Sequence, residues 1–149
     1  MRIFKIVMVD NSDKPDVHIP DRQIPDDQVE AYRAFYNDLI GFLPPRIRAR
    51  TDLMARLDPE LLDMQENLRK HCMYPEAFDV KTAQLMIYAI MLTQLNAAAR
   101  LHAIAALRAG ATLEELQAAT NLVFLFRGLS AANLGAELIQ SIIRDGDIP

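Results

Sequence analysis

The sequence predicts a nearly all-α protein that begins with a short strand or an extended arm, and three observations support this fold class. After residue 26, apolar residues recur at spacings of three and four, the period of an amphipathic helix. Capping residues precede several of these segments, and prolines or glycines separate them. With 149 residues, 51% of them hydrophobic, the chain is long enough for one domain with a sizeable core.

The N-terminal residues differ in composition from the rest. Residues 3–9 form a short segment rich in β-branched side chains, which favours one strand or an extended arm. Residues 10–27 are polar and contain several prolines, so we expect a surface loop there. We therefore divide the chain into residues 1–26, an arm with a polar loop, and residues 27–149, a helical domain. An apolar arm without a strand partner in its own chain should lie against another subunit.

The helices follow in order. The first should start near Asp26, and the Pro44-Pro45 pair should end it before a short helix that runs to Leu57. Residues 58–60, Asp-Pro-Glu, supply a cap, a first-turn proline and a first-turn acid for a third helix. That helix should run to about residue 70. Asp79 then caps a long apolar helix that should run to about residue 95.

The most informative segment surrounds His102. Residues 97–109 are rich in alanine, so a neighbouring helix can approach closely and leave the imidazole partly desolvated. Gly110 fits the left-handed position after a helix, and Thr112 with Glu115 forms a capping box for the next one. A last helix should begin after residue 130.

Composition excludes several classes of protein. A net charge of −4 gives no sign of a nucleic-acid partner. The single cysteine, Cys72, excludes an internal disulfide framework and suits a reducing cytoplasm. The N-terminus is a poor signal peptide, and the longest apolar run, residues 85–92, is too short to cross a membrane. His71 beside Cys72 lacks further ligands at metal spacing, so no metal site is expected.

The segment around His102 also resembles the carboxymuconolactone decarboxylase family, in which a histidine precedes a short Ala/Arg helix and a Gly-x-Thr-x-x-Glu turn. Other segments resemble further family signatures in the family's order: Gly41-Phe-Leu-Pro-Pro45-Arg46-Ile47, Leu57-Asp-Pro-Glu60-Leu61, Asp79-Val-Lys81-Thr-Ala-Gln84-Leu85 and Arg127-Gly128-Leu-Ser-Ala131-Ala132. The resemblance covers roughly residues 41–140. It implies a multi-helix bundle with the alkylhydroperoxidase D-like fold, assembled into homo-oligomers that are trimers or hexamers.

The resemblance also implies an activity. Redox members of the family carry a C-x-x-C pair just before the histidine, because a peroxidatic thiolate needs a resolving partner. Here residues 95–101 contain no cysteine, so a thiol peroxidase is disfavoured. Members without the pair resemble a decarboxylase that needs no metal or organic cofactor and acts on a carboxylated lactone from aromatic ring cleavage. The reaction could instead be a related lyase or isomerase step that transfers a proton.

The chain departs from the family at Gln84. Many members have a glutamate there, which is read as a proton relay with the histidine, whereas a glutamine can orient the imidazole but cannot accept its proton. This substitution keeps open a second class, a non-catalytic oligomeric protein that binds a small molecule. The fold inference does not depend on it.

The candidate site residues follow from these needs. His102 is the natural acid/base, with Gln84 as its partner. Arg46, beside Arg48, or Arg127 could anchor a substrate carboxylate, although each could also be a solvated or dipole-complementing residue. Arg100 stands about 200° from His102 on an ideal helix, so it should not face the same pocket and could serve a neighbouring subunit. Tyr88 is expected in the core or in the pocket wall.

Overall fold

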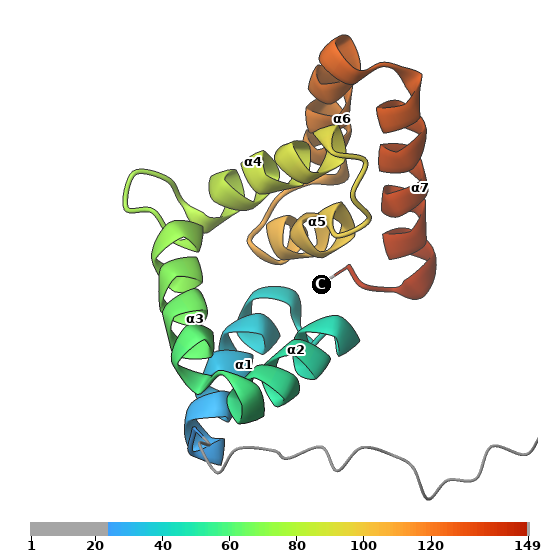
Figure 1. Ribbon diagram of the computed structural model, residues 1–149. Helices are drawn as coiled ribbons and strands as arrows, with labels where there is room; N and C mark the ends of the chain where they lie inside the picture. Colours follow the sequence, from blue (N-terminus) through green and yellow to red (C-terminus); the bar gives the residue numbers. More distant parts are fainter. Residues whose placement is uncertain (1–23, 149) are drawn as a thin grey trace, which may run out of the picture.

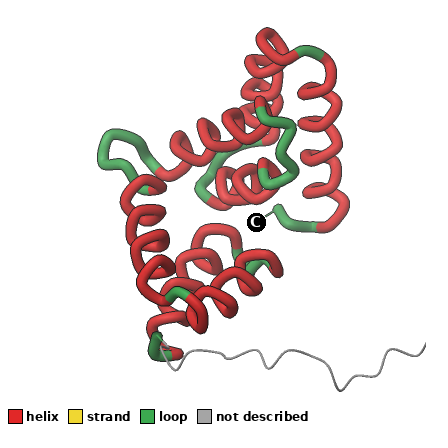
Figure 2. The backbone as a smooth tube through the Cα atoms, viewed as in Figure 1, coloured by secondary structure: helices red, strands yellow, loops and turns green. Residues whose placement is uncertain are grey.

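The structure, a computed structural model, describes residues 24–148, and within this range the chain is all α with no strand (Figure 1). The strand or arm expected at residues 3–9, and most of the loop that follows it, lie outside the described residues. Loops between the helices are short (Figure 2). The helices in chain order are α1 (Asp26–Ile40), α2 (Pro45–Leu57), α3 (Pro59–Met73), α4 (Val80–Thr93), α5 (Ala99–Arg108), α6 (Leu113–Arg127) and α7 (Leu129–Asp145).

The helix caps predicted from the sequence are present. Asp58 and Asp79 each accept a hydrogen bond from a first-turn backbone N–H, at 3.1 and 2.7 Å. Thr112 and Glu115 form the reciprocal capping box of α6. Gly110, after α5, has φ of +92°, the left-handed conformation that glycine adopts at least cost.

Two helix ends differ from the prediction. α3 continues past residue 70 to Met73 and stops only where Pro75 restricts the residue before it. α7 starts at Leu129 rather than after Ser130. The reason is Gly128, whose φ of 80° and ψ of −169° end α6 and let the chain turn directly into α7.

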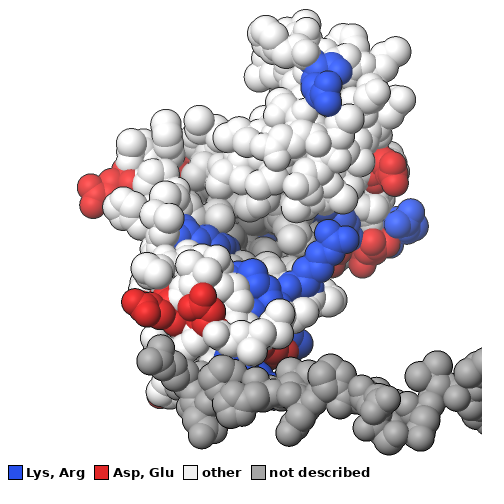
Figure 3. Space-filling model, viewed as in Figure 1, with Lys and Arg blue, Asp and Glu red and all other residues white. Residues whose placement is uncertain are grey.

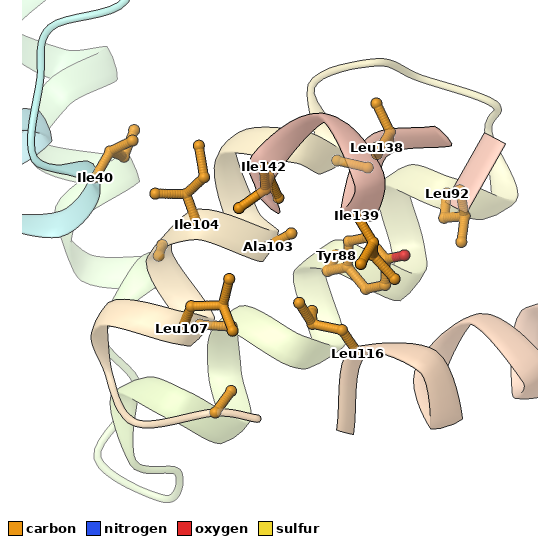
Figure 4. Packing of buried hydrophobic residues seen from close by; sticks show 14 of the residues in the cluster. Ile40, Tyr88, Leu92, Ala103, Ile104, Leu107, Leu116, Leu138, Ile139 and Ile142 are labelled. Atoms are coloured by element: carbon orange, nitrogen blue, oxygen red, sulfur yellow. The ribbon is translucent and has the colours of Figure 1, made fainter. Parts of the chain in front are cut away.

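The central helix of the core is α5, which packs against α1 on one side and against α4 and α7 on the other (Figure 1). Its residues Ala99, Ala103 and Ala106 are fully buried. Their small side chains allow the neighbouring helices to approach closely, as the alanine-rich sequence predicts. Figure 4 shows Ile104 of α5 between Ile40 of α1 and the α7 residues of the same cluster. This packing fixes the helix that carries His102.

Helices α1 and α2 are joined by a buried arginine. The Nε of Arg33 donates to Thr51 Oγ1 at 3.0 Å, and its guanidinium forms ion pairs with Glu30 and Asp52. A buried guanidinium is tolerated only with such partners, so the contact specifies how α2 lies on α1. A small apolar cluster lies beside it, formed by Ile24, Val29, Tyr32, Ala55 and Leu62.

The contact between α6 and α7 depends on Gly135. A Cβ atom at this position would lie 2.6 Å from Thr120 Cγ2, closer than Cβ atoms approach other groups in proteins, and 3.2 Å from Leu92 Cδ2, which is a tight contact. Gly135 is buried within α7, so its absent side chain permits the two helices to meet.

We predict that Gly135→Ala destabilises the protein by about 1–3 kcal/mol through overpacking, although alanine is the better helix former by about 1 kcal/mol. Urea unfolding followed by circular dichroism measures the change. Thr120→Ser removes the clashing methyl group and keeps the hydroxyl, so the double variant should recover part of the loss. A higher unfolding midpoint for Gly135→Ala alone would contradict the packing argument.

Candidate active site

A cavity of about 610 Å³ lies where α5 meets α1, α2 and α3. Figure 3 shows a hollow on one face between α1–α3 and α4–α7, bordered by Lys and Arg side chains. The lining contains four arginines and no carboxylate. Its residues are Tyr36, Leu39, Ile40, Pro44, Pro45, Arg46, Ile47, Arg50, Arg69, Met73, Ala97, Ala98, Arg100, Leu101 and His102.

The two predicted catalytic positions meet in the structure. His102 Nδ1 lies 2.9 Å from Gln84 Oε1, a hydrogen bond that joins α5 to the first half of α4. Gln84 is fully buried, and its Nε2 has no hydrogen-bond partner among the described residues. His102 lines the cavity and Gln84 does not, so the imidazole stands between the glutamine and the cavity.

The environment of His102 determines its charge. Burial lowers the pKa of His102 from 6.5 to about 4, and the positive charge of Arg69 acts in the same direction. The sequence predicts an acid/base group that titrates near neutrality. The structure differs because desolvation disfavours the charged imidazolium, so His102 in the free protein is neutral at pH 7.

A buried carboxylate organises the cationic wall. Glu66 of α3, whose side chain is only 3% exposed, forms an ion pair with Arg50 and accepts a hydrogen bond of 3.0 Å from the hydroxyl of Tyr36. Arg50 in turn donates to that hydroxyl at 3.0 Å. Arg69 lies 3.7 Å from the centre of the Tyr36 ring and 3.9 Å from the Glu66 carboxylate. The wall is therefore built from three helices, α1, α2 and α3, around one acid.

Arg46 lies on the cavity, as proposed from the sequence. It is exposed in the first turn of α2, and no carboxylate among residues 24–148 forms an ion pair with it. Its guanidinium is therefore available to an anion. Arg48, the neighbouring alternative, is not part of the lining.

Arg100 borders the same cavity as His102, contrary to the expectation from helix rotation. The reason is that the cavity extends past the start of α5, where Ala97 and Ala98 also line it. The guanidinium itself is engaged elsewhere. It donates to Asp145 and Asp147 at 2.8 and 2.7 Å, which fastens α5 to the end of α7.

Two candidate substrate-binding residues lie away from the cavity. Tyr88 is fully buried in the core, with its hydroxyl 2.7 Å from Thr120 Oγ1 (Figure 4). Arg127 is exposed at the end of α6, where its Nε donates to the backbone oxygen of Thr93 at 2.8 Å. Arg127 thus satisfies a carbonyl at the C-terminus of α4, because the two helix ends meet there.

Sequence reasoning missed three residues of the wall, Tyr36, Arg50 and Arg69. The spacing of four between Arg46 and Arg50 places both on one face of α2, and this signal was available. Tyr36 belongs to the apolar pattern of α1, so its polar role has no sequence signal. Arg69 comes from a helix whose orientation is decided only by tertiary packing.

A larger hollow of about 1110 Å³ lies near the end of α3 and is lined in part by Lys70, His71, Cys72 and Tyr74. It contains neither the desolvated His102 nor the arginines. The only cysteine of the chain therefore opens onto a different surface from the histidine. We place the candidate site in the smaller cavity because the buried titratable group and the unbalanced cations meet there.

Comparison with known proteins identifies the family of the chain. The model of the carboxymuconolactone decarboxylase family matches residues 59–140, more than half of the chain. The chain belongs to the carboxymuconolactone decarboxylase family. The family match covers α3 to α6 and most of α7, and thus includes His102, Gln84 and Arg69. Tyr36, Arg46 and Arg50 precede it.

A solved structure shares the fold of this carboxymuconolactone decarboxylase family member. The crystal structure of a candidate carboxymuconolactone decarboxylase from Burkholderia xenovorans LB400 matches with a TM-score of 0.65 at 19% sequence identity. The match covers 80% of this chain and 94% of the other. No curated protein matches the chain significantly.

Two surveys of the described residues complete the description. No group of three or more His, Cys, Asp or Glu side chains in residues 24–148 is arranged to hold a metal ion. None of the helices in that range combines the length and the apolar character needed to span a bilayer.

We predict that stability falls as the pH is lowered from 6.5 towards 4. In this window the unfolded chain takes up a proton on residue 102 and the folded protein does not, because the pKa of His102 is lowered to about 4 on folding. His102→Asn should flatten the pH dependence of the unfolding free energy measured with urea. His71→Asn, which removes an exposed imidazole, is the control. A slope that survives in His102→Asn would contradict the burial argument.

Proposed function

We propose that this protein is a cofactor-independent enzyme that acts on a small carboxylated lactone or an aromatic ring-cleavage product. The reaction is a decarboxylation, or a related lyase or isomerase step in which His102 transfers a proton. The observation that supports this most is the position of His102, desolvated on the wall of a cavity that carries four arginines and no carboxylate.

The charges of the wall support an anionic substrate. Arg100 is balanced by two aspartates, and Glu66 pairs closely with Arg50 but lies 3.9 Å from Arg69. One carboxylate cannot neutralise two arginines, so Arg46 and Arg69 carry most of the uncompensated positive charge. A guanidinium binds a carboxylate with two parallel hydrogen bonds. We assign Arg46 to binding the substrate carboxylate. We assign Arg69, whose charge lowers the pKa of His102, to stabilising the negative charge that develops during the reaction.

The apolar part of the cavity suits the ring of such a substrate. Leu39, Ile40, Ile47, Met73 and Leu101 contribute apolar surface beside the arginines. This combination offers a carboxylated ring both cations and hydrocarbon surface. When CO₂ or a proton leaves, the electron pair remains on the ring as an enolate, which guanidinium groups stabilise, and the imidazole exchanges the proton with carbon.

Gln84 and Cys72 bear on the two alternative functions, a non-catalytic binding protein and a thiol peroxidase. A non-catalytic binding protein stays the second candidate, because Gln84 cannot accept a proton from His102. A thiol peroxidase is less favoured, since Cys72 has no second cysteine and faces another hollow. A cytoplasmic location remains the expectation from the lone cysteine.

An oligomer is also part of this proposal. Leu122, Leu125, Phe126 and Leu129, at the junction of α6 and α7, are 64%, 70%, 91% and 69% exposed. Exposed apolar side chains in one patch are typical of an interface between proteins. The family resemblance makes a second copy of this chain the natural partner, in a trimer or a hexamer.

We predict that His102→Ala lowers turnover by about 10² to 10⁴, the usual contribution of an acid/base group, while circular dichroism remains that of the native fold. A panel of carboxylated lactones, followed by release of CO₂ and by NMR of the product, supplies the assay. Arg46→Gln, which removes an anchor and keeps the base, should raise KM more than it lowers kcat.

Cys72→Ser is the control in this assay and should keep full activity. Unchanged turnover of His102→Ala would exclude catalysis by the histidine and favour the binding-protein alternative. Peroxide reduction that is lost in Cys72→Ser would instead indicate the peroxidase.

We predict that Phe126→Glu lowers the molar mass in solution, because the new charge would be buried without a partner in the interface. Light scattering coupled to size-exclusion chromatography measures the mass. Gln117→Glu adds the same charge at an exposed polar position of α6 and is the matched control. Equal masses for Phe126→Glu and the wild type would place the interface elsewhere.

A further inference from the structure

We propose that Gln84 is a positioning residue that holds His102 with its proton on Nδ1 and the lone pair of Nε2 towards the cavity, so that the histidine enters the reaction as a base. This inference rests on the proposed function and specifies its first step. Two independent features of the site support it.

The first feature is the contact between the two side chains. The atom of Gln84 that meets His102 Nδ1, at 2.9 Å, is the carboxamide oxygen Oε1. An amide oxygen only accepts hydrogen bonds, so Nδ1 must donate. A neutral imidazole has one N–H, and Nε2 therefore carries the lone pair. The partner of a ring nitrogen commonly selects the tautomer of a histidine in this way.

The second feature is the chemistry of the cavity wall. The ionisable or charged groups that line the cavity with His102 are Tyr36 of α1, Arg46 and Arg50 of α2, Arg69 of α3 and Arg100 of α5. Glu66 pairs with Arg50, and Asp145 and Asp147 pair with Arg100. Guanidinium groups are donors without acceptor capacity. A lone pair on Nε2 suits a wall that carries four guanidinium groups, in which the Tyr36 hydroxyl already donates to Glu66 and accepts from Arg50.

The substitution at residue 84 matters because of the charge it removes. A carboxylate in contact with Nδ1 would stabilise the imidazolium form and favour a histidine that starts as an acid. The uncharged amide keeps the same hydrogen bond without that stabilisation. Because burial and Arg69 also oppose protonation, the neutral base is the resting form.

A base at this position determines the order of proton transfers. Nε2 removes a proton from the substrate carbon next to a carbonyl or carboxylate, and the C–H electron pair moves into an enolate beside the arginines. The imidazolium then has its Nδ1–H on Gln84 Oε1 and its new proton on Nε2. It returns that proton to a carbon of the enolate, which restores neutral His102 and completes an isomerisation with no other reactant.

The tautomer can be measured without a substrate. Long-range ¹H–¹⁵N spectra of the full-length protein with ¹⁵N-labelled histidine distinguish a protonated from an unprotonated ring nitrogen. The chain has only three histidines, so His18→Gln and His71→Gln assign the signal of His102. We expect neutral His102 at pH 7 with Nδ1 protonated. A proton on Nε2, or an imidazolium at pH 7, would overturn the proposal.

Two variants test the role of Gln84. Gln84→Glu keeps the acceptor and adds a charge, so the titration midpoint of His102 should rise by about 1 to 3 pH units. Gln84→Leu removes the acceptor and should abolish the preference for the Nδ1 proton. An exposed glutamine on α7, changed in Gln140→Leu, is the control. An unchanged tautomer in Gln84→Leu would reduce Gln84 to a packing residue and refute the assignment.

Malonate, a small dianion, separates this inference from the proposed function. If the cavity binds anions, saturation with malonate should raise the titration midpoint of His102, because a negative charge favours the imidazolium. Failure of malonate to bind, with the tautomer as expected, would count against the anionic substrate and leave the role of Gln84 intact. Binding of malonate to a protein whose His102 carries no proton on Nδ1 would refute the role of Gln84 and leave the anion site intact.

Discussion

The close packing of α5 against α1, α4 and α7 is the constraint on which the rest of the structure depends. Its buried alanines allow four helices to meet with little space between them. The same packing removes water from His102, which lies on this helix beside them, and brings Gln84 of α4 within hydrogen-bond distance. The tight core and the perturbed histidine therefore have one cause, the run of small residues around residue 102.

A second constraint is electrostatic and lies in the part of the cavity wall that comes from α1, α2 and α3. Glu66 is buried, so it must be paired, and it draws Arg50 and the Tyr36 hydroxyl towards itself. Because Arg100 is likewise held by two aspartates, the arginines of the wall do not contribute equally to binding. Of the four arginines on the wall, Arg46 and Arg69 therefore provide most of the attraction for an anion.

Together, these two constraints keep His102 neutral in a cavity that is lined by arginines. Desolvation and Arg69 both act against the imidazolium, and Gln84 does not oppose them with a negative charge. In the proposed reaction, binding of an anion between Arg46 and His102 would relieve this opposition and so couple substrate binding to proton transfer. This coupling connects the family's histidine, which lies in the matched residues 59–140, to arginines of α2 that lie before them.

The sequence by itself determined the helices, their caps and the family, because these depend on local spacing and on single residues such as Asp58, Asp79 and Gly110. It also predicted His102 and Gln84 as partners from a family motif, and the structure brings the two side chains within hydrogen-bond distance. It could not determine which arginines share the cavity. Arg127 satisfies the end of α4 and Tyr88 is in the core, whereas Arg50 and Arg69 line the wall. Only the tertiary structure decided this, since helices distant in sequence bring these side chains together and desolvation sets the charge of the histidine they surround.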